Sequence, residues 1–189
     1  MNKRHIAVTV LLLLVSVAFI NGYANDDLFY VEGNILHMNG DINSDTPDLL
    51  IEALESNPHV QEIIMHEVPG SLDDDSNLAA ARIVREQGLR TRVLPDSMIA
   101  SGGVDFFLAG TKRYVAKGAM IGVHSWGDGA SMEGRNLPRT HPDHQLYLEY
   151  YRAMQIPEAF YWFTLEAASS DNIHFMTEEE IQKYHIAAE

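Results

Sequence analysis

The apolar residues of this chain fall into short runs and helical stripes that alternate along its length. Two apolar runs at residues 28–31 and 35–38 flank a turn at 32–34, which predicts a β-hairpin. After Pro47, leucine and isoleucine residues recur at helical spacing over residues 49–54. Because proline is favoured in the first turn of a helix, we expect this helix to begin at Asp45 or Thr46.

The same alternation continues to the end of the chain. The predicted elements are strands at residues 60–65, 91–94, 113–115 and 120–123, and helices at 76–87, 104–109 and 145–168, the last broken at Pro157. Gly88 and Gly110 follow two of these helices, where glycine commonly takes a left-handed conformation. A final helix starts at the capping box of Thr177 and Glu180. We therefore predict one α/β domain of repeated βαβ units with a helical C-terminal part.

The first residues of the chain have the three-part pattern of a signal peptide. Two basic residues precede an apolar run at residues 6–20, and the small residues Gly22 and Ala24 follow it. An uncleaved membrane anchor is the alternative, but the run is shorter than the roughly 20 residues that a membrane span needs. We therefore predict a cleaved signal peptide at residues 1–24 and a periplasmic or secreted domain at 25–189, without a membrane span.

The composition narrows the range of partners and of chemistry. The whole chain has a formal charge of −14, and loss of Lys3 and Arg4 with the signal peptide changes it to −16. Nucleic acid and anionic membranes repel so acidic a protein, so neither is an expected partner. The chain has no cysteine, which excludes disulfides, a thiol nucleophile and a cysteine-based zinc site.

Two polar clusters resemble metal sites, and the sequence favours a structural role for both. Asp73, Asp74 and Asp75 precede a helix, where acidic side chains cap the first turn, and their spacing does not match an EF-hand. His141 and His144 are three residues apart, but no third ligand lies within reach in the sequence. We therefore expect no metal and no cofactor.

Candidate chemistry centres on Ser101 and His124. Small residues around Ser101 predict a turn that places this serine at the start of the helix at 104–109. The free N–H groups and the positive dipole end of a helix can hold an oxyanion there. His124 closes the strand at 120–123 and is a candidate to accept the serine's proton. Without further support, a turn serine and a strand-end histidine without catalysis are the simpler interpretation.

The sequence around these two residues resembles the active-site core of the Clp protease proteolytic subunit. An Ala-Ser-Gly step at Ser101 is followed by an apolar helix, Ala-Gly, Lys-Arg-Tyr-Val and Gly-Ala-Met-Ile-Gly-Val-His, which ends at His124. The pattern is closer still to Clp-like periplasmic proteins of the Clp/crotonase superfamily. The resemblance spans residues 35–186 and implies a Clp/crotonase-like fold, with Ser101 as nucleophile and His124 as general base. It also implies an oxyanion hole made by the N–H groups of Gly70 and Gly102, although the family usually has a further glycine beside Gly70.

The resemblance also bears on the acid of a catalytic triad. The segment that begins at Phe175 resembles the C-terminal part of the same family, where the triad aspartate lies two residues before the phenylalanine. Ile173 occupies that place in this chain, and the nearest acid is Asp171. Asp171 is therefore the candidate acid, and Asp128, Asp143 or no acid at all are the alternatives.

The leading functional hypothesis is a cofactor-free serine hydrolase that acts on peptide or protein substrates. A serine–lysine dyad with Lys112 or Lys117 is a variant that the presence of His124 disfavours. The alternatives are a catalytically inactive Clp-fold binding or assembly protein and a crotonase-type acyl-CoA enzyme, which export would separate from coenzyme A. Aromatic residues between Tyr147 and Phe163 exceed the needs of one helical stripe, which suggests a homo-oligomer contact or an apolar peptide-binding face.

Overall fold

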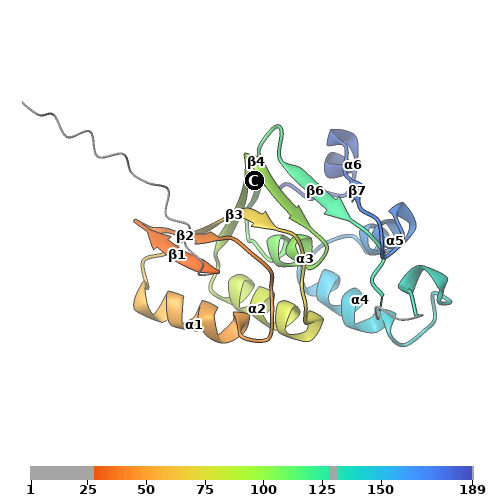
Figure 1. Cartoon of the computed structure of the whole chain (residues 1–189), viewed down its shortest axis with the longest axis horizontal. Coiled ribbons are helices and arrows are strands. Elements are labelled where there is room, and N and C mark those ends of the chain that lie inside the picture. Colours follow the sequence, from red (N-terminus) through yellow and green to blue (C-terminus); the bar gives the residue numbers. More distant parts are fainter. Residues whose placement is uncertain (1–27, 128–131, 189) are drawn as a thin grey trace, which may run out of the picture.

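A mixed β-sheet forms the centre of the protein in a computed structural model that describes residues 28–127 and 132–188 (Figure 1). The predicted signal peptide lies outside these residues. Within them, the strand order is β1-β2-β3-β4-β6-β7, and β5 pairs with the first part of β4. The strands are β1 (Phe29–Glu32), β2 (Ile35–Met38), β3 (Glu62–Val68), β4 (Arg90–Ala100), β5 (Arg113–Val115), β6 (Met120–Val123) and β7 (His174–Phe175).

The directions of the strands confirm the predicted α/β class. β1 and β2 form the predicted antiparallel hairpin, in which Phe29 lies opposite Met38. β3 pairs in parallel with β2 and β4, and β4 pairs in parallel with β5 and β6. Such parallel pairs need crossover connections, which the predicted helices supply. β7 runs antiparallel to β6, and the sequence pattern does not predict it.

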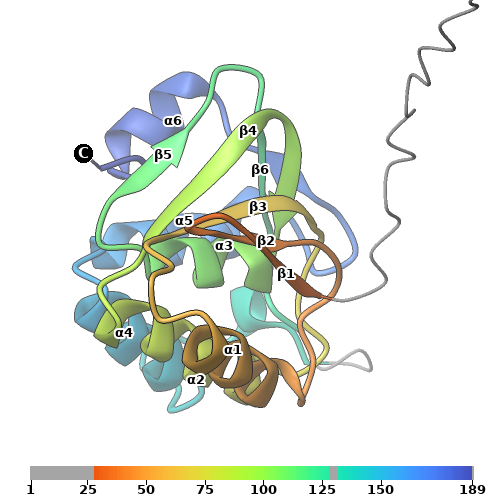
Figure 2. The same ribbon diagram turned by 90° about the vertical axis from the view of Figure 1, so that its left-hand side faces the viewer.

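The helices α1, α2, α3 and α4 form a layer against one face of the sheet (Figure 1 and Figure 2). Figure 2 shows α3 directly beneath the sheet, with α1, α2 and α4 further below. The helices are α1 (Thr46–Ser56), α2 (Asp74–Glu86), α3 (Gly102–Leu108), α4 (His144–Ala153), α5 (Glu158–Ala167) and α6 (Glu178–Lys183), with a 3-10 turn at Gly134–Asn136. Every residue of α3 is buried, because this helix lies between the sheet and the outer helices.

Local sequence signals account for several of the helix ends. The Asp73 side chain accepts a hydrogen bond of 2.9 Å from the N–H of Ser76 and so caps α2. Thr177 and Glu180 form the predicted capping box of α6. The helical region predicted at the C-terminal side divides into α4 and α5 before Pro157, as expected of a residue that has no N–H to continue a helix.

Gly110 does not have the predicted left-handed conformation. Gly88 ends α2 with a φ of +70°, as expected, whereas Gly110 is not among the residues with positive φ. Glycine is needed at Gly110 for a different reason: a β-carbon there would lie 2.1 Å from Oγ1 of Thr91. The end of α3 therefore packs directly against β4, a contact that no local sequence pattern reports.

β4 is longer than the predicted strand and contains a bulge. Met65 of β3 pairs with Val93, but Glu67 pairs with Met98, so β4 has extra residues between the two pairs. Pro95 lies among these extra residues, where a residue without an N–H interrupts no ladder hydrogen bond. The bulge separates the part of β4 that pairs with β5 from the part that pairs with β6.

The aromatic residues of α4 and α5 are mostly buried, so core packing accounts for most of the apparent surplus. The buried ones are Tyr147, Tyr150, Tyr151, Phe160 and Tyr161. Tyr147, Tyr151 and Tyr161 also line a pocket that opens beside Ser101.

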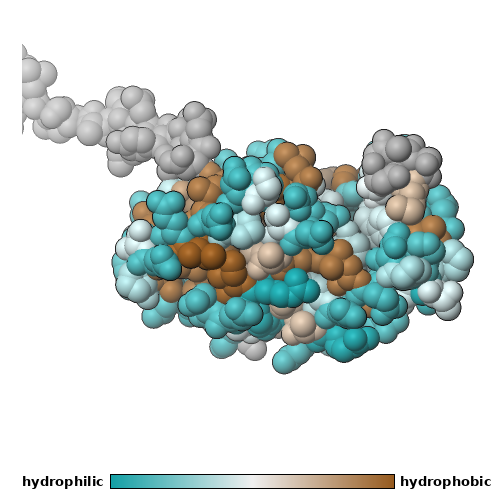
Figure 3. Space-filling model, turned by 90° about the horizontal axis from the view of Figure 1, so that it is seen from below, coloured by the Kyte–Doolittle hydropathy of each residue, from teal (hydrophilic) through white to brown (hydrophobic). Residues whose placement is uncertain are grey.

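The surface of the helical layer is largely polar. Figure 3 shows this face from below as teal surface with separate brown apolar patches. The large exposed apolar side chains of this part of the chain include Leu49 and Ile51 of α1 and Leu72 before α2. Among the described residues, no helix is long enough and apolar enough to cross a membrane.

Candidate active site

The carboxyl ends of three neighbouring parallel strands lie at the same end of the sheet. β3, β4 and β6 end at Val68, Ala100 and Val123. Because neighbouring parallel strands end at the same edge, Ser101 and His124 come to one place although they are far apart in the sequence. The N–H of Ser101 donates a hydrogen bond of 3.0 Å to the carbonyl of Gly122, which ties the end of β4 to β6.

Ser101 has a strained backbone conformation, with φ of 52° and ψ of −129°. Non-glycine residues rarely adopt a positive φ, and such strain costs on the order of 1–3 kcal/mol. The turn is held from both sides, because the N–H of Val104 also donates a hydrogen bond of 2.9 Å to the Ser101 carbonyl. Sharp turns from a strand into a helix expose the nucleophilic serine of α/β-hydrolases. Ser101 lies on such a turn and lines the pocket.

Close packing explains the two glycines after Ser101. A β-carbon on Gly102 would lie 2.3 Å from Oγ of Ser71, and one on Gly103 would lie 2.4 Å from the carbonyl oxygen of Val68. The loop after β3 is therefore pressed against the start of α3. The same packing brings Gly70 beside the serine, since a β-carbon on Gly70 would be 3.4 Å from Cβ of Ser101.

The N–H groups of Gly70 and Gly102 have no hydrogen-bond partner within the part of the chain that the structure describes. Gly102 is the first residue of α3, where the N–H groups of a helix are unpaired. Its carbonyl accepts a hydrogen bond of 2.9 Å from Nδ2 of the buried Asn77, which fixes the peptide next to Ser101. Although one glycine of the family pattern is missing, Gly70 still lies beside Ser101.

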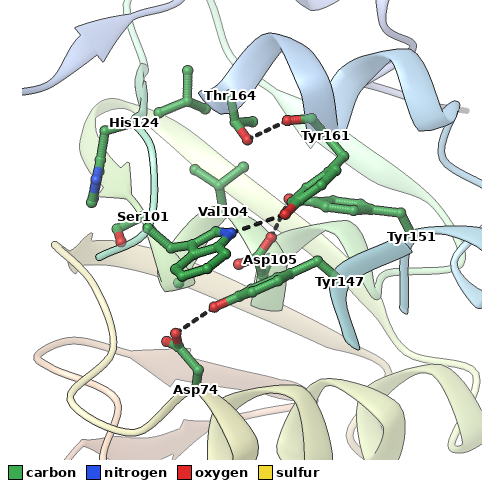
Figure 4. Close-up of a pocket in the computed structure, with 12 residues that line it drawn as sticks. Asp74, Ser101, Val104, Asp105, His124, Tyr147, Tyr151, Tyr161 and Thr164 are labelled. Atoms are coloured by element: carbon green, nitrogen blue, oxygen red, sulfur yellow. Dashed lines mark hydrogen bonds between the residues drawn. The ribbon is translucent and has the colours of Figure 1, made fainter. Parts of the chain in front are cut away.

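His124 faces the pocket from the end of β6 (Figure 4). Its Nδ1 lies 2.7 Å from the carbonyl oxygen of Ser125. Because a carbonyl can only accept a hydrogen bond, Nδ1 carries the proton and Nε2 is the basic nitrogen of the neutral ring. In the described part of the chain, no hydrogen bond joins Ser101 to His124. Catalytic hydrogen bonds often tighten only when substrate binds.

The structure does not bring Asp171 to the pocket. Asp171 is exposed, and its carboxylate accepts hydrogen bonds from Ser169 at 2.5 Å and Asn172 at 3.0 Å. The hydrogen bond from Ser169 lowers the pKa of Asp171. Asp143 lies 3.6 Å from His141 and also stays outside the pocket. Asp128 lies outside the described residues. In the described structure the ring of His124 is therefore oriented by a backbone carbonyl.

The lysines of the alternative dyad do not line this pocket either. Lys112 immediately precedes β5, and Lys117 lies in the turn between β5 and β6. Of the described residues with a basic side chain, only His124 lines the pocket with Ser101.

The far side of the pocket is formed by acidic and aromatic residues, of which the sequence analysis suggested only the tyrosines, as part of a peptide-binding face. These are Asp74, Asp105, Trp126, Tyr147, Tyr151 and Tyr161. Burial raises the pKa of Asp105 to about 7; the hydrogen bond from Tyr151 lowers it and the charge of Asp74 raises it. One signal was available in the sequence, because Asp105 is the single charged residue in the apolar run after Ser101.

His144 packs among the aromatic side chains of Trp126, Tyr161 and Trp162. Its ring is fully buried, and Nδ1 lies 2.6 Å from the hydroxyl of Tyr161. Its neighbour His141 lies with its ring centroid 6.4 Å away. Across the described ranges, no group of three or more histidine, cysteine, aspartate or glutamate residues is arranged to hold a metal ion.

The sheet and its helices define this chain as a mixed α/β domain that is structurally similar to Clp-like serine proteases. Two solved structures of the 1510-N membrane-bound stomatin-specific protease share the fold: a lysine-to-alanine mutant bound to a substrate peptide, and a serine-to-alanine mutant. The first has a TM-score of 0.55 at 17% identity, over 80% of this chain and 71% of the other. The second has a TM-score of 0.56 at 17% identity, over 80% and 75%. No protein-family model matches the chain, and no curated protein does.

Proposed function

We propose that the protein is a serine hydrolase that cleaves peptide or protein substrates, with Ser101 as nucleophile and His124 as general base. One observation carries the proposal. A serine in a strained strand-to-helix turn and a histidine at the end of the adjacent parallel strand line the same pocket. The peptide bound to a protein of similar fold supports a peptide as the substrate class.

The proposed reaction proceeds in two stages. His124 Nε2 takes the proton of Ser101 as Oγ attacks the carbonyl carbon of a peptide bond. The free N–H groups of Gly70 and Gly102 then stabilise the oxyanion. The histidine passes its proton to the leaving nitrogen, the C–N bond breaks and an acyl-enzyme remains. Water gives a proton to Nε2 as it attacks the acyl-enzyme, and that proton returns to Ser101 when the carboxylic acid leaves.

A fluorophosphonate probe tests this proposal, because such a probe reacts with activated serines and needs no knowledge of the substrate. We expect the mature protein to be labelled at Ser101 and the Ser101→Ala variant not to be labelled. The Ser56→Ala variant, which changes an exposed serine of α1, is the matched control and should be labelled like the unmodified protein. Absence of labelling in a folded protein would contradict the hydrolase proposal.

A binding or assembly protein without activity is the second candidate function. Two observations favour it: no carboxylate of the described residues contacts His124, and Ser101 forms no hydrogen bond with His124 in the described structure. In the serine-protease triad, loss of the acid's role lowers the rate by roughly four orders of magnitude. A protein that binds a peptide but is not labelled by the probe would have this function.

We also propose that the protein is exported and cleaved after Ala24. The basic, apolar and small-residue segments of residues 1–24 support this proposal. Sequencing of the protein from the cell envelope should give an N-terminus at Asn25. Recovery of the intact chain from a membrane pellet would contradict cleavage.

Self-association is a further expectation. Met120, Ile173 and Phe175 lie on or beside the edge formed by β6 and β7, and all three are more than 40% exposed. Exposed apolar residues at a sheet edge favour contact with a second copy. We expect light scattering at micromolar concentration to give a mass above that of one chain, and a constant monomer mass would contradict the expectation.

A further inference from the structure

The pocket beside Ser101 continues to a buried carboxyl group. Asp105 lies one helical turn after Ser101 on α3, and its side chain lines the pocket with only 9% of the residue exposed. Oδ1 accepts a hydrogen bond of 2.5 Å from the hydroxyl of Tyr151. The second carboxyl oxygen has no hydrogen-bond partner within the described ranges. Figure 4 shows Asp105 between the Ser101–His124 side and the tyrosines.

A second carboxylate lies in the same pocket. Asp74 accepts hydrogen bonds of 2.5 Å from Ser71 and from Tyr147. No lysine or arginine of the described residues lines the pocket with these two acids. The pocket therefore contains two acidic groups without a cationic partner, and burial makes the uncompensated charge of Asp105 costly.

Three stacked aromatic side chains line the pocket together with the acids. Trp126 and Tyr147 are nearly parallel, with ring centroids 6.0 Å apart, and Tyr147 and Tyr161 are nearly parallel at 5.7 Å. Aromatic faces attract cations, and the methylene groups of a lysine or arginine side chain pack well along them. The walls of the pocket are therefore compatible with a long side chain that ends in a positive charge.

The tyrosine hydroxyl groups of the pocket already form hydrogen bonds. Tyr147 donates to Asp74 and Tyr151 donates to Asp105. The Tyr161 hydroxyl accepts from Trp126 Nε1 at 2.9 Å and lies 2.6 Å from a ring nitrogen of His144. An acidic side chain would therefore meet two acids and few free donors. An aliphatic side chain would leave the free oxygen of Asp105 buried without a partner, which is also unfavourable.

We propose that this pocket binds the lysine or arginine side chain of the peptide residue whose carbonyl group Ser101 attacks. The inference rests on the proposed hydrolase function, because it takes Ser101 as the point where that carbonyl is held. The free oxygen of Asp105 pairs with the cation, Asp74 adds a second negative charge, and the aromatic faces contact the methylene groups. The strongly acidic mature chain also attracts basic peptides over longer distances.

A set of peptidyl phosphonates tests the inference. In these probes the phosphorus replaces the carbonyl carbon that Ser101 attacks, and the side chain of that residue is varied. The set has the same flanking sequence and a lysine-, arginine-, leucine- or glutamate-type side chain, and the rate of covalent labelling of Ser101 is measured. We expect the basic probes to react at least tenfold faster than the leucine probe and at least a hundredfold faster than the glutamate probe. Equal rates, or a faster leucine or glutamate probe, would overturn the inference.

Two variants identify the residue responsible for the preference. In Asp105→Asn, which keeps the acceptor for Tyr151, the ratio of lysine to leucine labelling rates should fall at least tenfold. In Asp75→Asn, which removes a neighbouring exposed acid outside the pocket, the ratio should stay within twofold of the unmodified protein. An unchanged ratio in Asp105→Asn would overturn the role of Asp105.

The simple fluorophosphonate, which has no peptide side chain, separates this inference from the proposed function. If it labels Ser101 while the basic probes show no preference, the hydrolase function stands and the inference fails. If it does not label Ser101 in the folded protein, the hydrolase function fails and the inference fails with it.

Discussion

Replacing Ser101 with alanine is expected to lower kcat/KM for a cleaved peptide at least about a thousandfold, and His124→Ala is expected to lower it equally. A thousandfold loss corresponds to about 4 kcal/mol of transition-state stabilisation. The losses should not add, because each residue has no role in proton transfer without the other. The double variant should therefore be about as slow as either single variant. Peptide hydrolysis by all three variants provides the measurement.

The same series tests the orientation of the imidazole. Asp171→Asn should change kcat/KM less than tenfold, because the carboxylate is exposed and bonded to Ser169 and Asn172. His59→Ala, at an exposed histidine on the hairpin side of the domain, is the matched control for loss of an imidazole. A loss in Asp171→Asn as large as that in His124→Ala would instead show that Asp171 reaches His124 during catalysis. Additive losses at Ser101 and His124 would show that the two residues act independently.

Asp105→Asn is expected to stabilise the protein at pH 8 by about 2–4 kcal/mol and to have little effect near pH 4. Burial raises the pKa of Asp105 from 3.8 to about 7, so the folded state keeps a proton that the unfolded state loses. This group's contribution to stability is thus fully present below pH 3.8 and is lost as the pH rises through about 7. Asparagine never ionises and still accepts the hydrogen bond from Tyr151.

Urea denaturation at pH 4.5, 6 and 8 measures the free energy of unfolding of both forms. Asp41→Asn, at an exposed aspartate, controls for the change in net charge. The stacked histidines His37 and His66, whose ring nitrogens lie 2.8 Å apart, change the stability of the protein with pH in the direction opposite to Asp105. Burial lowers the pKa of both, so their contribution is present above pH 6.5 and is lost as the pH falls. Because both histidines remain in Asp105→Asn, the difference between the two proteins isolates Asp105. A difference that is the same at every pH would contradict the prediction.

Local chemistry in the sequence determined most of the elements. The turn after β1, the strands β5 and β6, and the capping box at Thr177 were all predicted at or near their observed positions. These features depend on alternating apolar residues, on glycine in turns and on side chains that bond neighbouring backbone groups. Each of these interactions lies within a few residues, so a single sequence contains the information.

Tertiary contacts decided the remaining features of the fold and the candidate site. β4 continues through Pro95 because β3 pairs with it on both sides of the bulge, while β5 pairs before the bulge and β6 after it. β7 exists only through its pairing with β6. Likewise, Gly110 must be a glycine because Thr91 packs against it, and one carboxyl oxygen of Asp105 is held by Tyr151 of α4, which lies 46 residues later in the chain.

From the sequence, Ser101 and His124 are candidate residues because each lies at a junction between two predicted elements and because the surrounding pattern resembles the Clp active-site core. Only the tertiary structure placed them at one pocket, left Asp171 outside it and put Asp105 at its far side. The physical reason is that the ends of parallel strands meet through hydrogen-bonded pairing between segments distant in the chain. The pattern of residues within one segment does not specify which distant segment it pairs with.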